Sequence, residues 1–226
     1  MTMSVSEAVA TRFSCRAYRD EPVSEETVKT LIADATRAPS GGNLQPWHII
    51  ALSGAARDEA AQVATQTVMA NPAGEADEYP TYPAGLWDPY RTRRFEIGEA
   101  MYETIGIPRE DKPARLMHLT KNFQFFGAPV GLLFAIDRRM GHGQWAHLGM
   151  VMQTAALLAT ERGLATCMLE SWGMVRKTMH AHLALPKELV IYAGMALGVP
   201  DEAAAINSFR SARAPLKEVA DFRGFD

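Results

Sequence analysis

The spacing of hydrophobic residues predicts helices along most of the chain. Ser24 is suited to cap a helix, apolar residues recur at helical spacing after it, and Pro39 ends the run. A shorter helix over residues 4–11 begins at Ser4 or Ser6, with Glu7 in its first turn. The same reasoning predicts further helices over residues 56–69, 94–105, 114–125, 144–162 and 174–183.

Short apolar runs between these helices predict four strands, over residues 47–52, 129–136, 164–169 and 189–197. The helix at 144–162 is apolar nearly all round, so we expect it inside the protein or in a dimer interface. Residues 71–94 have no period but contain four prolines and four aromatic residues. Such a stretch is typical of a lid or of a plain surface loop. The pattern predicts an α+β domain over residues 1–206, a lid-like insertion at about 71–94, and an extended C-terminal arm over 207–226.

Composition excludes several classes of protein. The 23 basic and 26 acidic side chains give a net charge of −3, which does not favour nucleic-acid binding. Hydrophobic residues make up 47% and charged residues 22%, as in ordinary globular proteins. The first ten residues do not resemble a signal peptide, and the apolar run at 148–159 is too short to span a bilayer. We therefore expect a cytoplasmic protein without a membrane partner, whose two cysteines are reduced.

Other familiar chemistries find little support in the sequence. The six histidines lack the spacing of metal ligands, and no Gly-x-Ser-x-Gly motif of a hydrolase is present. The segment from Gly141 to Ala146 fits the dinucleotide-binding pattern Gly-x-Gly-x-x-Ala. However, four residues separate it from the preceding strand, and Glu161, the acidic residue some twenty positions on, lies at the end of a helix. A turn that starts a helix is the better interpretation.

Three segments carry more information. Arg12, Ser14 and Arg16 alternate after the first helix, and arginines suit phosphate oxygens. Residues 38–47 (Ala-Pro-Ser-Gly-Gly-Asn-Leu-Gln-Pro-Trp) combine two glycines with hydrogen-bonding side chains. Residues 207–215 (Asn-Ser-Phe-Arg-Ser-Ala-Arg-Ala-Pro) again carry arginines on a segment without a clear fold. Taken singly, each segment also fits an ordinary solvated loop.

Together these segments resemble the nitroreductase family of FMN enzymes. The similarity covers nearly the whole chain and includes Phe-Gly-Ala-Pro at 126–129 and Cys-Met-Leu-Glu-Ser-Trp at 167–172. Residues 71–108 resemble a nitrobenzoate-reductase-like subgroup. The resemblance implies a mostly antiparallel central sheet flanked by helices. It also implies an intertwined homodimer with tightly bound FMN at the interface.

The resemblance also implies roles for individual residues. Arg12, Ser14 and Arg213 would hold the phosphate and ribityl end, and Arg16 would face the pyrimidine edge of the flavin. The backbone at 170–171 would donate to flavin N5, and the loop at 39–43 would come from the partner subunit. The implied FMN-binding residues are Arg12, Phe13, Ser14, Arg16, Pro39, Ser40, Asn43, Met168, Leu169, Glu170, Ser171, Arg210 and Arg213.

The sequence departs from better-known family members at two positions. Phe13 stands where some members have a polar residue, and Ser211 stands where a second basic residue is often found. Arg210 is the candidate to supply that charge. Arg93 and Arg94 are candidates for the mid-chain basic residue that often contacts the flavin ring.

The implied activity is transfer of electrons from NAD(P)H through flavin N5 to small electrophilic acceptors such as nitroaromatics or quinones. No side chain is required as a catalytic acid or base and no metal is implied, while Trp87 and Tyr90 would stack on a flat substrate. Three alternatives stay open. The first is a reductive dehalogenase or flavin-cleaving enzyme of the same fold. The second is a flavin-binding protein without turnover, and the third is a colourless structural dimer.

Overall fold

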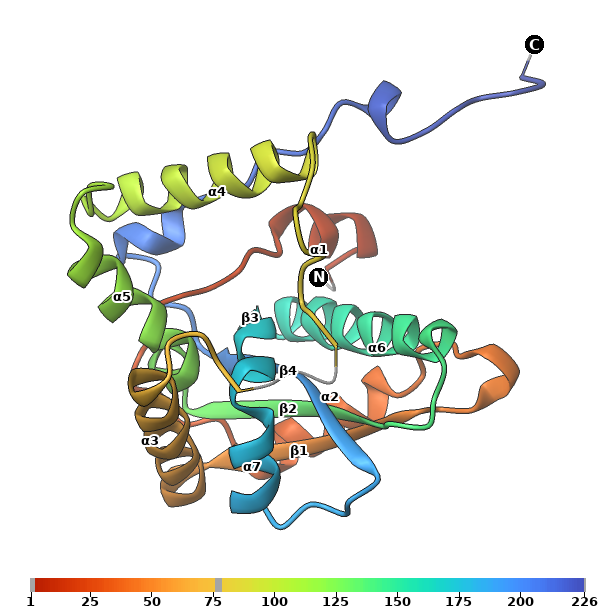
Figure 1. Cartoon of the computed structure of the whole chain (residues 1–226). Helices are drawn as coiled ribbons and strands as arrows, with labels where there is room; N and C mark the ends of the chain where they lie inside the picture. Colours follow the sequence, from red (N-terminus) through yellow and green to blue (C-terminus); the bar gives the residue numbers. More distant parts are fainter. Residues whose placement is uncertain (1–2, 76–78, 226) are drawn as a thin grey trace.

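The computed structural model of the protein describes residues 3–75 and 79–225. Within them, helices surround a single sheet (Figure 1), which confirms the predicted α+β class. The helices are α1 (Val5–Thr11), α2 (Glu25–Ala35), α3 (Gly54–Ala70), α4 (Tyr90–Thr104), α5 (Lys112–Thr120), α6 (His142–Glu161) and α7 (Arg176–His182). The strands are β1 (Trp47–Ser53), β2 (Val130–Asp137), β3 (Ala165–Leu169) and β4 (Leu189–Gly198). The 3-10 turns are η1 (Gly41–Asn43), η2 (Lys121–Gly127), η3 (Glu170–Val175), η4 (Ala205–Ser208) and η5 (Leu216–Glu218).

The sheet has the strand order β1–β2–β4–β3, and every neighbouring pair is antiparallel. In this register Ile50 lies opposite Leu133, and Leu169 lies opposite Gly194. The two central strands are buried almost throughout because helices cover both faces of the sheet, which explains their nearly continuous apolar sequences. Strand β3 is at the edge of the sheet, so the backbone groups on its outer side can pair with other parts of the chain.

Each face of the sheet has its own hydrophobic core. Leu132 and Phe134 of β2 pack with α2 and α6 on one face. Leu133 points to the opposite face, where it packs with residues of α3, α7 and the turns η2 and η3. This alternation is the normal period of two in a strand, so β2 contributes to both cores.

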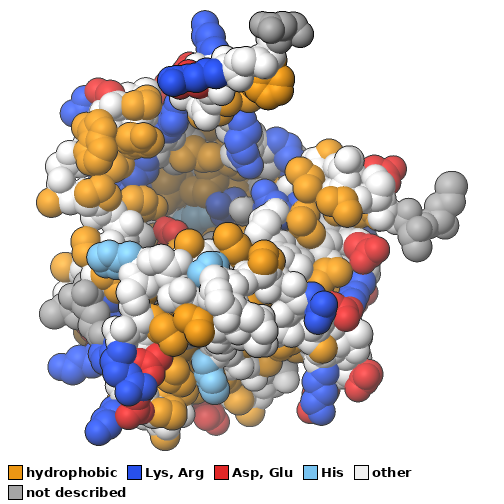
Figure 2. All heavy atoms as spheres, turned by 90° about the vertical axis from the view of Figure 1, so that its right-hand side faces the viewer, with side chains coloured by type: hydrophobic (Ala, Val, Ile, Leu, Met, Phe, Trp, Pro, Cys, Tyr) orange, Lys and Arg blue, Asp and Glu red, His pale blue; other side chains and the backbone are white. Residues whose placement is uncertain are grey.

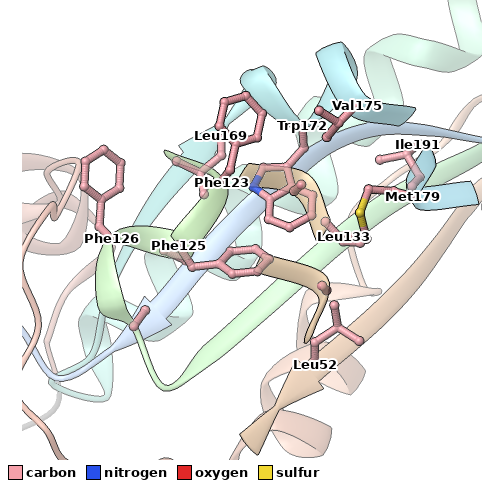
Figure 3. Packing of buried hydrophobic residues seen from close by; sticks show 14 of the residues in the cluster. Leu52, Phe123, Phe125, Phe126, Leu133, Leu169, Trp172, Val175, Met179 and Ile191 are labelled. Atoms are coloured by element: carbon pink, nitrogen blue, oxygen red, sulfur yellow. The ribbon is translucent and has the colours of Figure 1, made fainter. Parts of the chain in front are cut away.

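Two aromatic side chains dominate the second core (Figure 3). The rings of Phe125 and Trp172 stack with their centroids 4.4 Å apart, and both are fully buried. The Trp172 indole donates to the carbonyl of Asn122. Both rings lie over glycines of the central strands: a Cβ at Gly131 would lie 2.4 Å from Phe125, and one at Gly194 would lie 2.6 Å from Trp172. These glycines therefore make room for the aromatic pair.

The helix predicted over residues 114–125 ends at Thr120, five residues earlier than expected. The chain continues as η2, in which Phe125 and Phe126 have left-handed φ angles of 50° and 53°. Apolar spacing alone does not reveal this reversal, because both phenylalanines still face hydrophobic surroundings. Helix α4 starts at Tyr90 rather than Arg94, directly after Pro89.

Helix α4 stands apart from the sheet and has no buried residue (Figure 1). It joins α5 through the Arg115 guanidinium, which contacts both carboxylate oxygens of Glu99 at 2.6 and 3.0 Å. The Gly141 segment is the N-terminal end of α6, and residues 138–140 separate it from β2, so the dinucleotide pattern there is only a helix start. Among the residues that the structure describes, no helix is long and apolar enough to cross a membrane.

Candidate functional site

The segment after α1 runs along the open edge of β3. Ser14 forms a parallel bridge with Thr166, and the Cys15 amide donates to the Thr166 carbonyl at 2.9 Å. Cys15 turns into the protein interior, where it is fully buried. Because this backbone is fixed by the sheet edge, the flanking side chains of Arg12 and Arg16 are held beside β3.

These side chains line a cavity of about 630 Å³ together with the C-terminal arm. Figure 2 shows a hollow on this side of the molecule, with Lys or Arg side chains at its rim and hydrophobic side chains at its back. The structure thus brings together six of the predicted site residues from opposite ends of the chain: Arg12, Phe13, Ser14, Arg16, Arg210 and Arg213.

Within the described part of the chain, the positive charges of this cavity have no acidic partners. No carboxylate of the described residues lies within ion-pair distance of Arg12, Arg16 or Arg213. Burial lowers the pKa of Arg12, and the nearby positive charge of Arg213 lowers it further. Arg213 contacts only the hydroxyl and backbone carbonyls of its own segment. Crowded, uncompensated guanidinium groups of this kind are suited to bind a phosphate.

One buried amide joins the two ends of the chain at this cavity. The Asn207 side chain accepts a hydrogen bond from the Arg16 amide at 2.8 Å and donates to the carbonyls of Ala17 and Asp201. Just beyond it, the Arg210 guanidinium lies 4.1 Å from the centroid of the Phe13 ring and donates to the Asn207 carbonyl. Phe13, which departs from the polar residue of some family members, therefore supports Arg210.

The end of β3 forms a second part of the site. Beyond Thr166, the outer edge of β3 has no strand partner within the described part of the chain, so its backbone groups are open to a ligand. Met168 is partly exposed, whereas the Leu169 side chain is buried in the core, which leaves only its backbone for binding. The Ser171 hydroxyl is buried and has no hydrogen-bond partner among the described residues.

Glu170 points away from that edge into a separate cavity of about 510 Å³. Aromatic side chains of Tyr79, Trp145 and Tyr192 form much of its wall, and neighbouring atoms raise the pKa of the Glu170 carboxyl by partly desolvating it. Tyr192 occupies the register shift between β2 and β4, which frees its carbonyl to accept the Tyr79 hydroxyl at 3.3 Å.

A group of residues that were not predicted to belong to the site lies beside Arg16. The Phe126 ring is 6.0 Å from the Arg16 guanidinium carbon and 5.9 Å from the His118 ring, centroid to centroid. His118 is buried, and its Nε2 has no partner among the described residues. Burial lowers the pKa of His118, with smaller effects from the charges of Lys121 and Arg16. Among sequence features, only Gly127 hinted at an unusual turn here.

The loop of residues 38–46 lies elsewhere in the chain. Its Ser40 hydroxyl accepts the Gln45 amide, and its Gly41 amide donates to His147 of α6 at 3.2 Å. Pro39 and Asn43 are exposed, and within the described part of a single chain neither lines the Arg12 cavity. One chain alone therefore does not assemble all the predicted FMN-binding residues.

The predicted lid, residues 71–94, is fastened to the body in its first part. The Glu75 carboxylate accepts the amides of Lys177 and Thr178 at the start of α7, and Tyr79 packs on Trp145 at 4.4 Å. Residues 76–78 of this stretch lie outside the described residues.

In the second part, Trp87 and Tyr90 form an exposed edge-to-face pair with centroids 5.5 Å apart. Of the two candidate mid-chain arginines, Arg93 pairs with Glu218 at 2.8 Å, and Arg94 lies over the ring of Tyr82 at 4.3 Å. Both arginines line the groove between α4 and the arm. The charges of Lys121 and Arg16 both act on His118.

Comparison with known proteins identifies the family. Residues 9–199 match the model of the Nitroreductase family. The nitrobenzene nitroreductase of Ectopseudomonas oleovorans is 34% identical over 218 residues, with 96% of each chain covered. The 4-nitrobenzoate reductase of Pseudomonas putida is 34% identical over 226 residues, which is 100% of this chain and 98% of the relative.

Solved structures agree over almost the entire chain. The FMN and NADPH-dependent nitroreductase NfnB from Sphigopyxis sp. strain HMH superposes with a TM-score of 0.93 at 43% identity, covering 99% of this chain and 100% of its own. The FMN-dependent nitroreductase NfnB from Mycobacterium smegmatis, solved in complex with NADPH, has a TM-score of 0.90 at 30% identity, with 97% and 98% covered. These similarities confirm the resemblance found in the sequence and the predicted fold. The chain belongs to the nitroreductase family.

Proposed function

We propose that this protein is an FMN-dependent oxidoreductase that uses NAD(P)H to reduce small electrophilic molecules such as nitroaromatics or quinones. The observation that carries the proposal is the pair of guanidinium groups of Arg12 and Arg213, which crowd one cavity without a carboxylate among the described residues. A phosphate ester would relieve this repulsion. The names of the full-length relatives, which include FMN- and NADPH-dependent nitroreductases, support the same cofactors.

The residues present fit FMN at both ends. Arg12, Ser14 and Arg213 would bind the phosphate, with Arg210 in place of the second basic arm residue that Ser211 lacks. The end of β3 and the start of η3, residues 168–171, would face the ring and donate backbone hydrogen bonds near N5. Within the described residues, the outer edge of β3 beyond Thr166 has no strand partner and the buried Ser171 hydroxyl has no hydrogen-bond partner, and both features support this role.

A homodimer completes the site in this proposal. The loop of residues 38–46 from a second copy would supply Pro39, Ser40 and Asn43 to the flavin. Exposed apolar side chains at Val5, Val9 and Leu44 support such an interface, since they are 76%, 56% and 54% exposed in the single chain. The arm over residues 207–226 carries further exposed apolar residues, so it would wrap around the partner. Residues 1–206 would form the single catalytic domain.

The chain contributes binding and electrostatics rather than an acid or base. The chemistry supplied by bound FMN is hydride acceptance from NAD(P)H at N5 and delivery of electrons to the acceptor. Arg16 places a positive charge where negative charge gathers on reduction of the ring, which favours the reduced state. Trp87 and Tyr90, as part of the insertion at 71–94, would stack on a flat acceptor that takes the place of NAD(P)H.

The first test is the visible absorption spectrum of the purified protein, followed by NADPH addition without oxygen. We expect flavin bands that bleach with NADPH and recover when a nitroarene is added. The matched variants are Arg213→Ala, which should lose FMN, and Lys217→Ala, four residues further along the arm, which should keep it.

Two results would contradict the proposal. A protein that stays colourless after incubation with excess FMN and gel filtration does not bind flavin, as the structural-dimer alternative predicts. A yellow protein that neither NADPH nor NADH bleaches is a flavin-binding protein without turnover. Faster turnover of a halophenol than of a nitroarene or quinone would instead identify a reductive dehalogenase of the same fold.

A further inference from the structure

The turn before β2 adopts an unusual backbone. Phe125, Phe126 and Gly127 have successive φ angles of 50°, 53° and 79°. For a residue with a side chain, the left-handed region costs roughly 1–2 kcal/mol. Two consecutive phenylalanines in this region therefore need a compensating reason, and strain of this kind often accompanies functional sites.

As a result of this turn, the rings of Phe125 and Phe126 point in different directions (Figure 3). Phe125 enters the core and stacks on Trp172, whereas Phe126 lies apart from the other labelled side chains. There Phe126 meets Arg16 at 6.0 Å and His118 at 5.9 Å, and it is 8% exposed. Phe126 belongs to the same core cluster as Phe125, but it is the Phe126 ring that lies over the Arg16 guanidinium.

The other contacts of Arg16 are neutral as well. Its guanidinium donates weakly to the Ser14 carbonyl at 3.3 Å, and no carboxylate of the described residues lies within ion-pair distance. A carboxylate would hold the guanidinium more firmly, but it would also cancel its charge at the flavin. An aromatic face attracts a cation without carrying a net charge.

We propose that Phe126 is a positioning residue: its ring fixes the Arg16 guanidinium toward the flavin while leaving the positive charge available to stabilise the reduced cofactor. This inference rests on the proposed FMN function. This role of Phe126 would explain the strained turn, because an ordinary helical continuation after Thr120 would not separate the Phe125 and Phe126 rings in this way.

The test is the midpoint potential of the FMN-loaded holoenzyme, measured by spectroscopic titration against a reference dye. Phe126→Leu removes the aromatic face, and we expect the protein's preference for reduced over oxidised FMN to fall about 3- to 10-fold. This corresponds to a midpoint lower by about 15–30 mV, at about 30 mV per tenfold for a two-electron couple. Phe126→Gly is a second variant without a ring, and glycine adopts the φ of 53° without strain.

Two controls separate positioning from a structural role. Phe126→Tyr keeps the ring and should keep the wild-type potential. Phe95→Leu makes the same kind of change beneath Arg109, whose guanidinium carbon lies 5.1 Å from the centroid of the Phe95 ring on α4. Because Phe95 does not line the Arg12 cavity, this variant should leave the potential unchanged.

The inference is overturned if the variants without a ring match the wild-type potential, or if either control shifts it as much as they do. Those results would leave the proposed function intact, because the wild-type protein would still carry FMN that NADPH reduces. A wild-type protein that binds no FMN would overturn the proposed function and this inference together.

Discussion

The Phe125 ring leaves no room for a side chain at position 131 of β2. A Cβ there would lie 2.4 to 2.6 Å from the three outermost atoms of the ring. The ring cannot easily move, because it is fully buried and stacked on Trp172 at an interplanar angle of 23°. Gly131→Ala therefore forces one of the most rigid parts of the core apart.

The expected cost is at the upper end of the range for overpacked cores, about 3 kcal/mol. For a chain of this size, that lowers the melting temperature by about 6–12 °C. Thermal unfolding followed by circular dichroism, together with urea titration, measures the change. Gly98→Ala is the matched control: a Cβ on this α4 residue meets nothing within 4 Å, so the substitution should be neutral or slightly stabilising.

A second substitution tests whether the Phe125 ring is what excludes a side chain at position 131. Phe125→Leu lacks the three outermost ring atoms, so in its presence Gly131→Ala should cost about 1–2 kcal/mol less than it does alone. Strict additivity of the two changes would mean that the Phe125 ring is not what excludes a side chain. A melting temperature within about 2 °C of wild type for Gly131→Ala, less than 1 kcal/mol for this size of chain, would refute the steric reasoning itself.

Three further predictions concern other parts of the molecule. Arg213→Ala should weaken FMN binding about 10- to 100-fold by loss of a charge-assisted hydrogen bond, measured by flavin fluorescence, whereas Lys217→Ala should leave it unchanged. Glu75→Gln removes the carboxylate that accepts amides at the start of α7, so urea unfolding should show a loss of about 1–2 kcal/mol that exposed Glu59→Gln does not share. The pKa of His118 is lowered in the folded state, so the unfolded chain binds more protons and stability falls as pH drops below 6.5; His118→Gln should reduce that fall in urea titrations above and below this pH.

Each of these predictions has a clear contradicting result. Equal FMN affinities for the two arm variants would remove Arg213 from the phosphate site. Equal stabilities of the Glu75 and Glu59 variants would mean that α7 does not depend on its carboxylate cap. An unchanged pH dependence without His118 would show that its imidazole titrates normally in the folded protein.

Much of the fold followed from local patterns. Ser4 and Glu7 form the reciprocal capping hydrogen bonds that a helix start favours, and Ser24 caps α2 as expected. The strands were found because helices cover both faces of the sheet, which makes β2 and β4 nearly continuous apolar runs. Arg12, Arg16 and Arg213 were named because their spacing resembles a family motif; the structure places them at one cavity, and their contact with FMN stays a prediction.

The features that were missed depend on tertiary packing. The left-handed turn at 125–127 arises because Trp172, which is distant in sequence, and Gly131 of the next strand together fix where Phe125 goes. His118 lies on an ordinary amphipathic helix, and its significance appears only when Arg16 is placed next to it. Arg93 and Arg94 were named through the family resemblance. Position along a helix does not state which side of a cavity a residue will face, so contact of either arginine with the flavin stays a prediction.

The cavity that joins residues 12–16 to residues 210–213 also sets an order of events during synthesis. The Arg16 amide and the Asn207 side chain that fixes it are 191 residues apart. Residues 12–16 are therefore made long before Asn207 is available to hold them. Before residues 210–213 are made, the chain has only the arginines at positions 12 and 16 for this cavity and lacks those at 210 and 213. An anion that needs both halves of the cavity can therefore bind only at the end of synthesis.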